Sequence, residues 1–399
     1  KEAIEHMAEY ELSNGITTIC PASMTFSEEQ LTQIFENAAN YKSEKGATLV
    51  GINMEGPFIS YEKKGAQNGE YIHRPDADMF ERLQTAANGL IKLCDIAPEV
   101  DGAMDCIEKI SDKVTVSMAH TAADWDIATE AIQKGAKHVT HLYNAMPPYS
   151  HRAPGVIGAA CDNEQVMVEL ICDGIHSHPS TVRTTFKMFG DDRIVLISDS
   201  MEACGLEDGQ YSLGGQDVTV KGNLAILTEL GNIAGSVTNL MKCMRKAVKE
   251  MGIPLESAVK CATMNPTKAI GIYDKYGSLT EGKQADVVLL DKDLVEILNH
   301  HNNIVMMRDE NIKNDLQEIV KIANRTLKIF QINKAKQEER QKNMQTINES
   351  LKTATKVIDK CVQEVEENKE ENKFAQKEQE IYLLMKNKNV NIENCSVRL

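Results

Sequence analysis

Short apolar runs rich in β-branched residues alternate with helical stretches through residues 1–291, and this alternation restricts the fold more than any other feature. The apolar runs are predicted strands, at residues 16–20, 48–53, 90–96, 114–118, 138–141, 166–172 and 193–198. Predicted helices accompany them at residues 1–14, from 27 onward, and at 76–88, 99–110, 124–134 and 179–189. Repeated strand–helix units place parallel strands in one sheet, either doubly wound or closed into a (β/α)8 barrel. The seven strands are one fewer than such a barrel contains.

Local signals refine this pattern at several points. The chain lacks an initiator Met and opens in a helical stretch that would follow a strand, so we expect a first barrel strand before Lys1. Ser27 and Gln30 can form a capping box at a helix start. The pairs Gly214-Gly215 and Gly222-Asn223 predict a hairpin-like insert after the seventh strand. The remaining predicted elements are helices at 237–251 and 255–262 and a strand–turn–strand unit at 277–290.

Glycine and proline divide the chain into two regions. All 24 Gly and all 10 Pro lie before residue 283. Because these residues mark turns in α/β folds, the compact domain is predicted to end near Asp291. Beyond it, apolar residues recur at steps of three and four, which predicts amphipathic helices or a coiled coil. These residues are Ile312, Leu316, Ile319, Ala323, Ile347, Leu351, Ala354, Ile358, Cys361 and Val365. The helical region is either a solvated appendage or a module for protein interaction, whose partner is unknown.

The charge distribution excludes two classes of partner. Residues 1–294 contain 26 Lys+Arg and 42 Asp+Glu, a net charge of −16, whereas residues 295–399 contain 18 and 17. An acidic body repels nucleic acid and anionic membranes, so we predict neither as a partner. An anionic substrate would need a local trap, such as one Arg or a helix N-terminus. The ten cysteines form no CxxC pair, which indicates free thiols in the cytoplasm.

Four polar residues lie at or just beyond the ends of predicted strands, where barrel enzymes carry their chemistry. They are Glu55, His120, His141 and Asp199. One carboxylate and two imidazoles match a catalytic zinc-type site with a position left for water. The further carboxylate, Asp199, can serve as a general base. His138 has the opposite parity to His141 and is predicted to face outward.

Other chemistry-bearing residues have weaker patterns. Asp173-Gly174-Ile175-His176 ends the sixth strand, and its spacing leaves open whether His176 contacts a substrate or is a loop residue. The Gly-rich stretches contain neither GxxxxGK[ST] nor a strand-linked GxGxxG, so no nucleotide-binding loop is predicted. Ser198 and Ser200 lie in no GxSxG motif, which argues against a serine nucleophile. The histidines without a partner pattern are predicted at the surface: His6, His73, His151, His178, His300 and His301.

Seven ordered motifs within about 1–291 resemble those of the N-acetylglucosamine-6-phosphate deacetylase family, a branch of the amidohydrolase superfamily. They are Asn53-Met54-Glu55-Gly56-Pro57-Phe58, Lys64-Gly65-Ala66-Gln67-Asn68, the strand end at His120, Thr140-His141-Leu142-Tyr143-Asn144-Ala145-Met146, Asp173-Gly174-Ile175-His176, Ser198-Asp199-Ser200-Met201 and Ala234-Gly235-Ser236. A string of ordered motifs is more specific than any one of them. The resemblance implies a (β/α)8 barrel with a small β-sandwich, usually dimeric.

The resemblance also implies residue roles. Glu55, His120 and His141 would hold one divalent metal ion, with zinc preferred and iron, manganese or cobalt as alternatives, and Asp199 would be the catalytic acid/base. The Arg152 position would meet the sugar phosphate of an amino-sugar phosphate substrate. The substrate-binding positions implied by the family are Ala66, Gln67, Asn144, Ala145, Arg152, His176, Ile233, Ala234 and Gly235.

Two departures from the family pattern shape the expected architecture. The first barrel strand, with its His-x-His-type motif, and the N-terminal sandwich strands would lie before Lys1, and the closing sandwich strands after Asp291 are replaced by the helical segment. We therefore predict a barrel that lacks its first strand at 1–272, a sandwich remnant at 273–294 and a helical, coiled-coil-like appendage at 295–399. Position 67 is Gln where some relatives have His, which would shift carbonyl activation toward the metal and His176.

The predicted activity is metal-assisted hydrolysis of the N-acetyl group of N-acetylglucosamine 6-phosphate. Asp199 would take a proton from water and pass it to the departing amine. Two alternatives stay open from the sequence. The chain could be another amidohydrolase that acts on a different amide. It could instead be an inactive truncated or chimeric product whose helical part is an interaction module.

Overall fold

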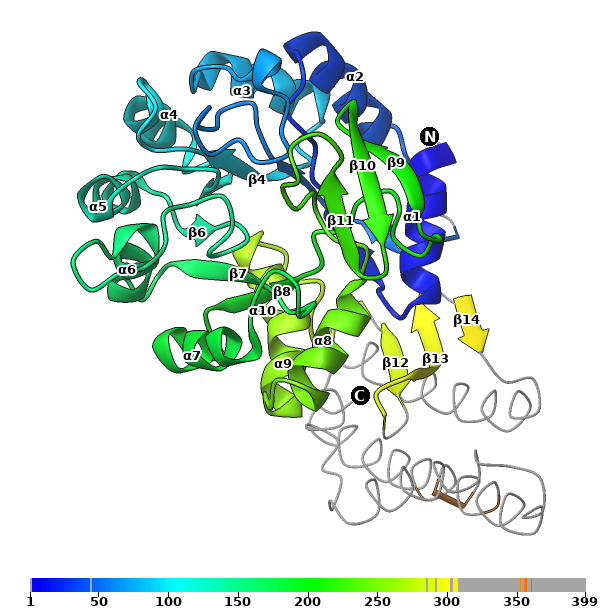
Figure 1. The fold of residues 1–399 in the computed structure, drawn as a ribbon. Helices are drawn as coiled ribbons and strands as arrows, with labels where there is room; N and C mark the ends of the chain where they lie inside the picture. The colour runs from blue at the N-terminus through cyan, green and yellow to red at the C-terminus, as the bar shows by residue number, and fades with distance from the viewer. Residues whose placement is uncertain are drawn as a thin grey trace, which may run out of the picture. The chain divides into compact units, whose positions relative to one another are not determined.

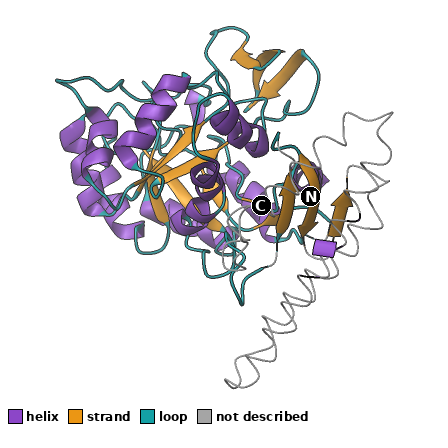
Figure 2. Cartoon of the chain, turned by 90° about the horizontal axis from the view of Figure 1, so that it is seen from below, coloured by secondary structure: helices purple, strands orange, loops and turns teal. Residues whose placement is uncertain are grey.

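The computed structural model describes residues 2–43, 45–284, 286–290, 293–301 and 304–307, together with positions 352, 355, 356 and 360. The chain divides into two compact units, 1–273 and 274–399. The first unit contains a curled parallel sheet with helices on its outside (Figure 1). Figure 2 shows the strands gathered inside this layer of helices. Among the described residues, no helix is long and apolar enough to cross a bilayer.

All seven predicted strands are present in the predicted order, and the run predicted at 48–53 forms two short strands, at 48–49 and 52–54. The strand β1 pairs parallel with β2, and β3 to β8 form a six-stranded parallel sheet in chain order. Beyond the end of β1, Ala22 forms an isolated parallel bridge with Asn53 of β3. The strands are β1 (Thr18–Ile19), β2 (Thr48–Leu49), β3 (Ile52–Met54), β4 (Ile91–Ile96), β5 (Thr115–Met118), β6 (His138–Val139), β7 (Met167–Ile171) and β8 (Ile194–Ile197).

Among the described residues, β8 and β1 are not paired with each other. A strand before Lys1 would lie outside this chain, so that part of the expectation stays a prediction.

Helices form where the sequence supplies caps and an apolar face. Ser27 and Gln30 form the predicted capping box at the start of α2, and Asp76 and Asp124 cap α3 and α5 through their side chains. Two helices, α6 and α10, were not predicted, and α4 begins at Ala103 because residues 99–102 form a turn. The helices around the sheet are α1 (Glu2–Ser13), α2 (Glu28–Ala39), α3 (Ala77–Ala86), α4 (Ala103–Ile110), α5 (Trp125–Lys134), α6 (Gly155–Asp162) and α7 (Pro179–Phe189).

The predicted insert after β8 forms a three-stranded antiparallel sheet, β9 (Gly209–Leu213), β10 (Gln216–Lys221) and β11 (Leu224–Leu227). Its turns lie at the predicted glycine pairs. One face of this sheet packs on Met201, Ala203 and Ala234, and Ala66 packs against the same cluster. The insert therefore covers loops that follow β3 and β8. It is followed by α8 (Leu240–Lys249), α9 (Leu255–Ala262) and α10 (Met264–Ala269).

The second unit corrects two predictions. The unit at 277–290 contains one strand, β12 (Val287–Leu290), whereas residues 277–284 form turns and irregular backbone. The predicted helical appendage begins instead with two strands, β13 (Glu296–His301), which pairs antiparallel with β12, and β14 (Ile304–Met307), which pairs antiparallel with β13. The prediction extended to these residues a helical spacing that starts at Ile312, and strand pairing is not visible in local periodicity. The apolar residues that predicted a coiled coil lie outside the described residues.

Glu11 on α1 makes stability depend on pH. Burial raises the pKa of Glu11 to about 7 from an ordinary 4.5, so the folded protein holds this proton more tightly than the unfolded chain. Its contribution to stability is full below pH 4.5 and is lost as the pH rises to about 7. We expect Glu11→Gln to resist urea better than the parent at pH 8, with a smaller difference at pH 5. Equal urea midpoints of parent and variant at pH 8 would contradict this.

Candidate metal centre and active site

The strand-end residues that the sequence singled out gather at the carboxyl ends of the sheet. Glu55 follows β3 directly, while His120, His141 and Asp199 each come two residues after the end of β5, β6 and β8. Because neighbouring parallel strands end on the same side of the sheet, their following residues converge. The φ angles of His120, His141 and Asp199 are 43°, 33° and 51°. These left-handed conformations are uncommon for residues other than glycine and cluster at functional sites.

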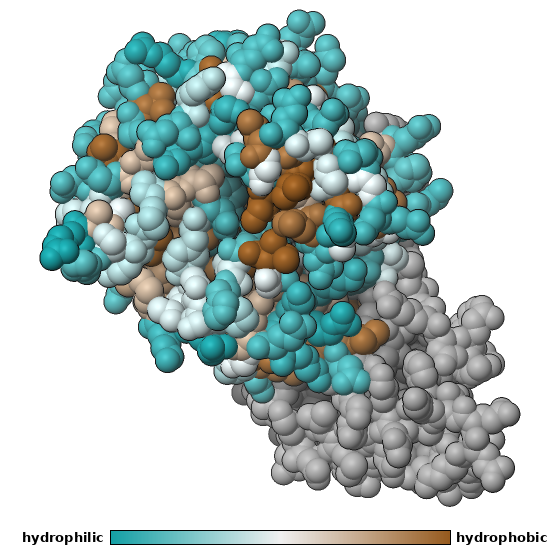
Figure 3. Space-filling model, in the orientation of Figure 1, coloured by the Kyte–Doolittle hydropathy of each residue, from teal (hydrophilic) through white to brown (hydrophobic). Residues whose placement is uncertain are grey.

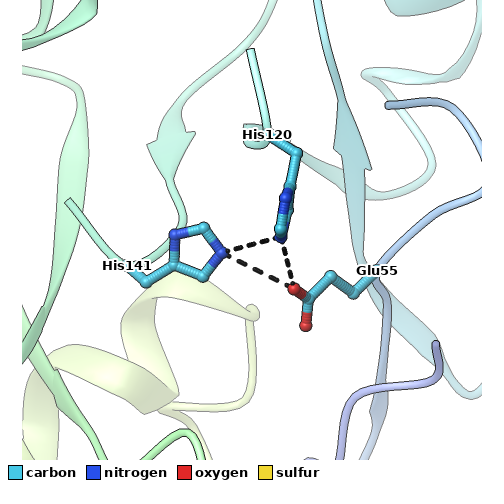
Figure 4. Close-up of side chains that lie close together, drawn as sticks. All are labelled: Glu55, His120 and His141. Carbon is cyan, nitrogen blue, oxygen red and sulfur yellow. Dashed lines mark hydrogen bonds and ion pairs between the residues drawn. The ribbon is translucent and has the colours of Figure 1, made fainter. Parts of the chain in front are cut away.

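Glu55, His120 and His141 form a buried triad (Figure 4). The Oε1 atom of Glu55 lies 2.9 Å from Nε2 of His120 and 3.5 Å from Nε2 of His141. The two Nε2 atoms are 3.1 Å apart, and the rings meet edge to face. Three ligand atoms of the kinds that bind zinc therefore point at one position.

The hydrogen bonds around the triad fit a metal ion. Nδ1 of His120 donates to the carbonyl of Lys63 at 2.9 Å, so in the neutral ring the lone pair lies on Nε2 and faces Glu55. A backbone carbonyl that holds the far nitrogen is the usual support of a metal-binding histidine. Nδ1 of His141 is buried without a hydrogen-bond partner in the described structure. The two Nε2 atoms and the Oε1 atom of Glu55 converge, and the neutral side chains have too few N–H groups to hydrogen-bond all three pairs. This set of lone pairs matches the ligands of a divalent cation.

The electric field at the triad favours positive charge. Burial lowers the pKa of His141, but the hydrogen bond and negative charge of Glu55 outweigh it, and Asp199 and Asp95 add to them, which raises the pKa to about 10. Burial raises the pKa of Glu55, but the hydrogen bonds to His120 and His141 dominate and hold it well below its usual range. A metal ion would satisfy the same field that here favours a proton.

Gln67 supports Glu55 from the loop after β3. Its Nε2 donates to Oε1 of Glu55 at 3.2 Å, and its Oε1 accepts the backbone N–H of Thr25 at 2.7 Å. Gln67 is almost fully buried. The amide therefore orients the carboxylate of the triad. The substrate contact that the family resemblance implied for Gln67 stays a prediction.

Asp199 interacts electrostatically with the triad and with His176. Burial and the negative charge of Glu55 raise the pKa of Asp199, while His141 and His176 partly offset this. Nδ1 of His176 donates to Oδ2 of Asp173 at 2.7 Å, and the His176 side chain is buried. This contact holds the ring in one orientation and leaves its Nε2 for another partner. The site thus contains a carboxyl group with a raised pKa, Asp199, and an imidazole of fixed orientation, His176.

The implied substrate positions on the loop after β6 form one turn. The side-chain amide of Asn144 donates to two carbonyls of its own turn, including that of His141. The carbonyl of Ala145 accepts the backbone N–H of Thr121, which connects this turn to the one that carries His120. Arg152, further along the loop, is exposed. The loop therefore exposes the guanidinium of Arg152 to solvent.

The remaining implied positions lie where the insert meets β8. Ile233 is exposed, whereas Ala234 is buried in the cluster that also contacts Ala66. Gly235 has φ +60°, and a Cβ at this position would lie 3.1 Å from the carbonyl oxygen of Asp199. A larger residue would crowd the turn that carries Asp199, so glycine is required there.

Hydrophobic side chains gather on the face shown in Figure 3, over the region of the β9–β11 sheet. Exposed apolar residues near this insert are Leu206, Leu230 and Ile233. Contiguous exposed apolar patches on soluble proteins mark contact surfaces for a partner or a ligand.

The predicted orientation of His138 is wrong. The residue is 1% exposed, its Nδ1 hydrogen-bonds Oγ of Ser117 at 3.1 Å, and burial lowers its pKa to about 3. The parity argument failed because β6 ends at Val139 and the chain turns into a left-handed conformation at His141. Strand alternation cannot be counted through such a turn.

A buried polar network connects the strands of the site, and sequence reasoning missed it. Asp95 accepts hydrogen bonds from Asn53 at 3.3 Å and from Thr140 at 2.9 Å. The Thr140 hydroxyl also bonds that of Ser117, which reaches His138. Burial raises the pKa of Asp95 well above its usual range. The available signal was Asp95 between Cys94 and Ile96 near the end of a predicted strand, because a fully buried Asp is rare unless it is paired.

Comparisons with known proteins identify the family of this chain. Residues 1–327 match the model of the amidohydrolase family. The N-acetylglucosamine-6-phosphate deacetylase of Bacillus subtilis (strain 168) is 40% identical over 290 residues, which cover 71% of this chain and 73% of that protein. The human protein of the same name is 31% identical over 292 residues, 71% of each chain.

Solved structures give the same result. The N-acetyl-D-glucosamine-6-phosphate deacetylase of Mycobacterium smegmatis matches with a TM-score of 0.73 and 31% identity, covering 77% of this chain and 82% of that one. The Pasteurella multocida N-acetylglucosamine-6-phosphate deacetylase matches with a TM-score of 0.70 and 29% identity, covering 77% and 79%. The resemblance read from the motifs is confirmed.

Proposed function

This chain belongs to the amidohydrolase family, and from that membership and the site we propose that it hydrolyses the N-acetyl group of N-acetylglucosamine 6-phosphate to acetate and glucosamine 6-phosphate. The observation that carries the proposal is the convergence of Glu55, His120 and His141 on one point. Asp199 interacts electrostatically with all three residues. Relatives named for this deacetylation, at 31–40% identity, support the substrate.

The three residues of the triad would hold one divalent metal ion, with zinc preferred for two imidazoles and one carboxylate. Such an ion supplies Lewis-acid activation of a water molecule and of the amide carbonyl. Gln67 keeps Glu55 oriented, and the carbonyl of Lys63 keeps His120 oriented. These contacts hold the ligands in place before an ion arrives, which lowers the cost of binding it.

Asp199 moves the proton. Its carboxylate takes a proton from the attacking water and returns it to the sugar nitrogen as the C–N bond breaks. The raised pKa of Asp199 suits this task, because a base is most effective when its pKa is near the working pH. Nε2 of His176, in a ring fixed by Asp173, faces the substrate, and the loops at Ala66 and at 233–235 surround the sugar.

Arg152 contacts the phosphate of the substrate. We expect Arg152→Ala to raise KM for N-acetylglucosamine 6-phosphate at least ~10-fold, since a bidentate charge-assisted hydrogen bond is lost. Hydrolysis of unphosphorylated N-acetylglucosamine should change little, because that sugar has no phosphate to lose. Steady-state kinetics on both sugars would measure the two effects. Similar losses on both substrates would mean that Arg152 does not recognise the phosphate.

The direct test of the proposed function is substrate profiling. The purified chain would be incubated with N-acetylglucosamine 6-phosphate, with the unphosphorylated sugar and with cyclic amides, and released acetate would be measured. We expect the phosphorylated sugar to have the highest kcat/KM. Turnover of a cyclic amide alone would favour a different amidohydrolase. A folded, metal-loaded chain that hydrolyses none of them would favour an inactive product.

Further features stay proposals. By resemblance the chain is a cytoplasmic homodimer, and the exposed apolar residues near the insert suit a protein contact. The division at 272 and the helical part of 295–399 beyond β14 also stay predictions, with no partner assigned to that part. The observed division into two units falls after residue 273.

A further inference from the structure

Both histidines of the triad lie in strained turns. His120 and His141 have positive φ values, 43° and 33°, and such a conformation persists only where surrounding contacts hold it. The direction of each imidazole depends on its backbone, so a relaxed turn would move Nε2 away from the shared position. Whatever holds these two turns therefore also controls the geometry of the triad.

Glu99 holds the turn that begins at His120. Its Oε2 accepts the hydroxyl of Thr121 at 2.5 Å, and its Oε1 accepts the backbone N–H of Ala122 at 2.5 Å. Glu99 lies three residues beyond the end of β4, the strand that neighbours β5 in the sheet. Both oxygens of one carboxylate are thus used on two successive residues after the histidine.

Glu169 holds the turn that begins at His141 in a related way. Its side-chain Oε2 accepts the backbone N–H of His141 at 3.2 Å, and its own carbonyl accepts the N–H of Leu142 at 2.9 Å. Glu169 lies on β7, next to β6. The residue is 8% exposed, and Nε2 of His138 lies 3.9 Å from its Oε1. A buried carboxyl group is costly unless its oxygens are hydrogen-bonded.

We propose that Glu99 and Glu169 are positioning residues for the metal centre, each fixing from the neighbouring strand the left-handed turn that carries one histidine ligand. The inference rests on the proposed metal site and adds two residues to it. The hydrogen bonds of both carboxylates go to the turns and not to the side chains of the triad, so the backbone carries their effect on the ligand geometry. Their removal should change how well the site binds metal, in addition to how stable the fold is.

The test compares two substitutions at each position in the full chain. Glu99→Leu and Glu169→Leu remove every acceptor oxygen of the side chain while keeping a similar volume. Glu99→Gln keeps one of the two oxygens that Glu99 uses, whereas Glu169→Gln keeps the one oxygen that Glu169 uses. Glu11→Leu is the matched control, because Glu11 is also a largely buried carboxyl but belongs to α1. Circular dichroism and a cooperative melt would show which variants fold.

The readout is Co²⁺ binding to the metal-free protein, followed by competition with a chromophoric chelator and by the visible d–d spectrum. We expect both Leu variants to bind Co²⁺ at least ~10-fold more weakly than the parent, as for loss of contacts that orient metal ligands, with an altered spectrum. Glu169→Gln should bind close to the parent, and Glu99→Gln should lie between its parent and its Leu variant. Glu11→Leu should match the parent in affinity and spectrum.

Three results would overturn the proposal. Folded Leu variants with parental Co²⁺ affinity and spectrum would show that the turns do not need these carboxylates. An equal loss in Glu11→Leu would show a general effect of buried substitution. If the Leu variants do not fold, the Gln variants decide: equal affinity of Glu99→Gln and the parent overturns the role of Glu99, and a folded Glu169→Gln that binds Co²⁺ at least ~10-fold more weakly than the parent overturns the role given to the oxygen of Glu169. A parent that binds no Co²⁺ would instead refute the metal site itself, which separates the two failures.

Discussion

Asp199→Asn is expected to lower kcat on N-acetylglucosamine 6-phosphate at least ~100-fold, the usual loss when general acid–base help is removed. Asparagine has nearly the same shape but cannot accept the proton of the attacking water. Because Asp199 is outside the triad, metal content and KM should change little. Steady-state kinetics and elemental analysis on the same preparation would measure all three quantities.

The control for this variant is Asp192→Asn. Asp192 is an exposed carboxylate two residues before β8, at the opposite end of the strand from Asp199, and it pairs with Lys260. Its loss should leave kcat within about twofold of the parent, since surface ion pairs contribute little. Near-parental turnover by Asp199→Asn would remove Asp199 from the mechanism.

Removal of one triad ligand is expected to have an effect at least as large. The parent should contain about one divalent ion per chain, because three ligand atoms and an open position complete a catalytic site. His141→Ala should lose most of that ion and at least ~100-fold of turnover, since the activation of water and carbonyl goes with it. Elemental analysis of dialysed protein and acetate release would measure these losses.

Metal binding should also stabilise the parent. A ligand that binds only the folded state raises the melting temperature, so chelation should lower the Tm of the parent but hardly that of His141→Ala. His6→Ala, an exposed histidine on α1, is the matched control and should behave as the parent does. A metal-free parent that still hydrolyses the substrate would refute a role for this centre.

Residue patterns located much of the site before the structure. Glu55, His120, His141 and Asp199 were identified as polar residues at predicted strand ends, and the structure brings the first three into contact. Their grouping followed from topology, because parallel strands that are neighbours in sequence end on one side of the sheet. Gln67 was associated with the site by resemblance, but its actual contacts with Glu55 and Thr25 were not foreseen.

The failures share a physical cause. His138 was assigned to the wrong face because a left-handed turn at His141 breaks the alternation of a strand. The strands β13 and β14 were predicted as helix because the pairing of β13 with β12 and of β14 with β13 is a contact that local spacing does not encode. Glu99 was placed at the start of a helix, whereas it lies in the turn before α4 and accepts hydrogen bonds from Thr121 and Ala122.

Local sequence was sufficient for the elements whose stability is local and for the identity of the chemistry. Periodic apolar faces, the Ser27–Gln30 capping box and the glycine turns of the insert depend on residues close together in the chain. Three-dimensional packing decided the contacts between distant segments. Glu169 reaches His141 across 28 positions and Glu99 reaches Ala122 across 23. Which strands lie side by side decides such partners. His120 and His141 keep their strained backbone conformations because Glu99 and Glu169 accept hydrogen bonds from the turns that carry them.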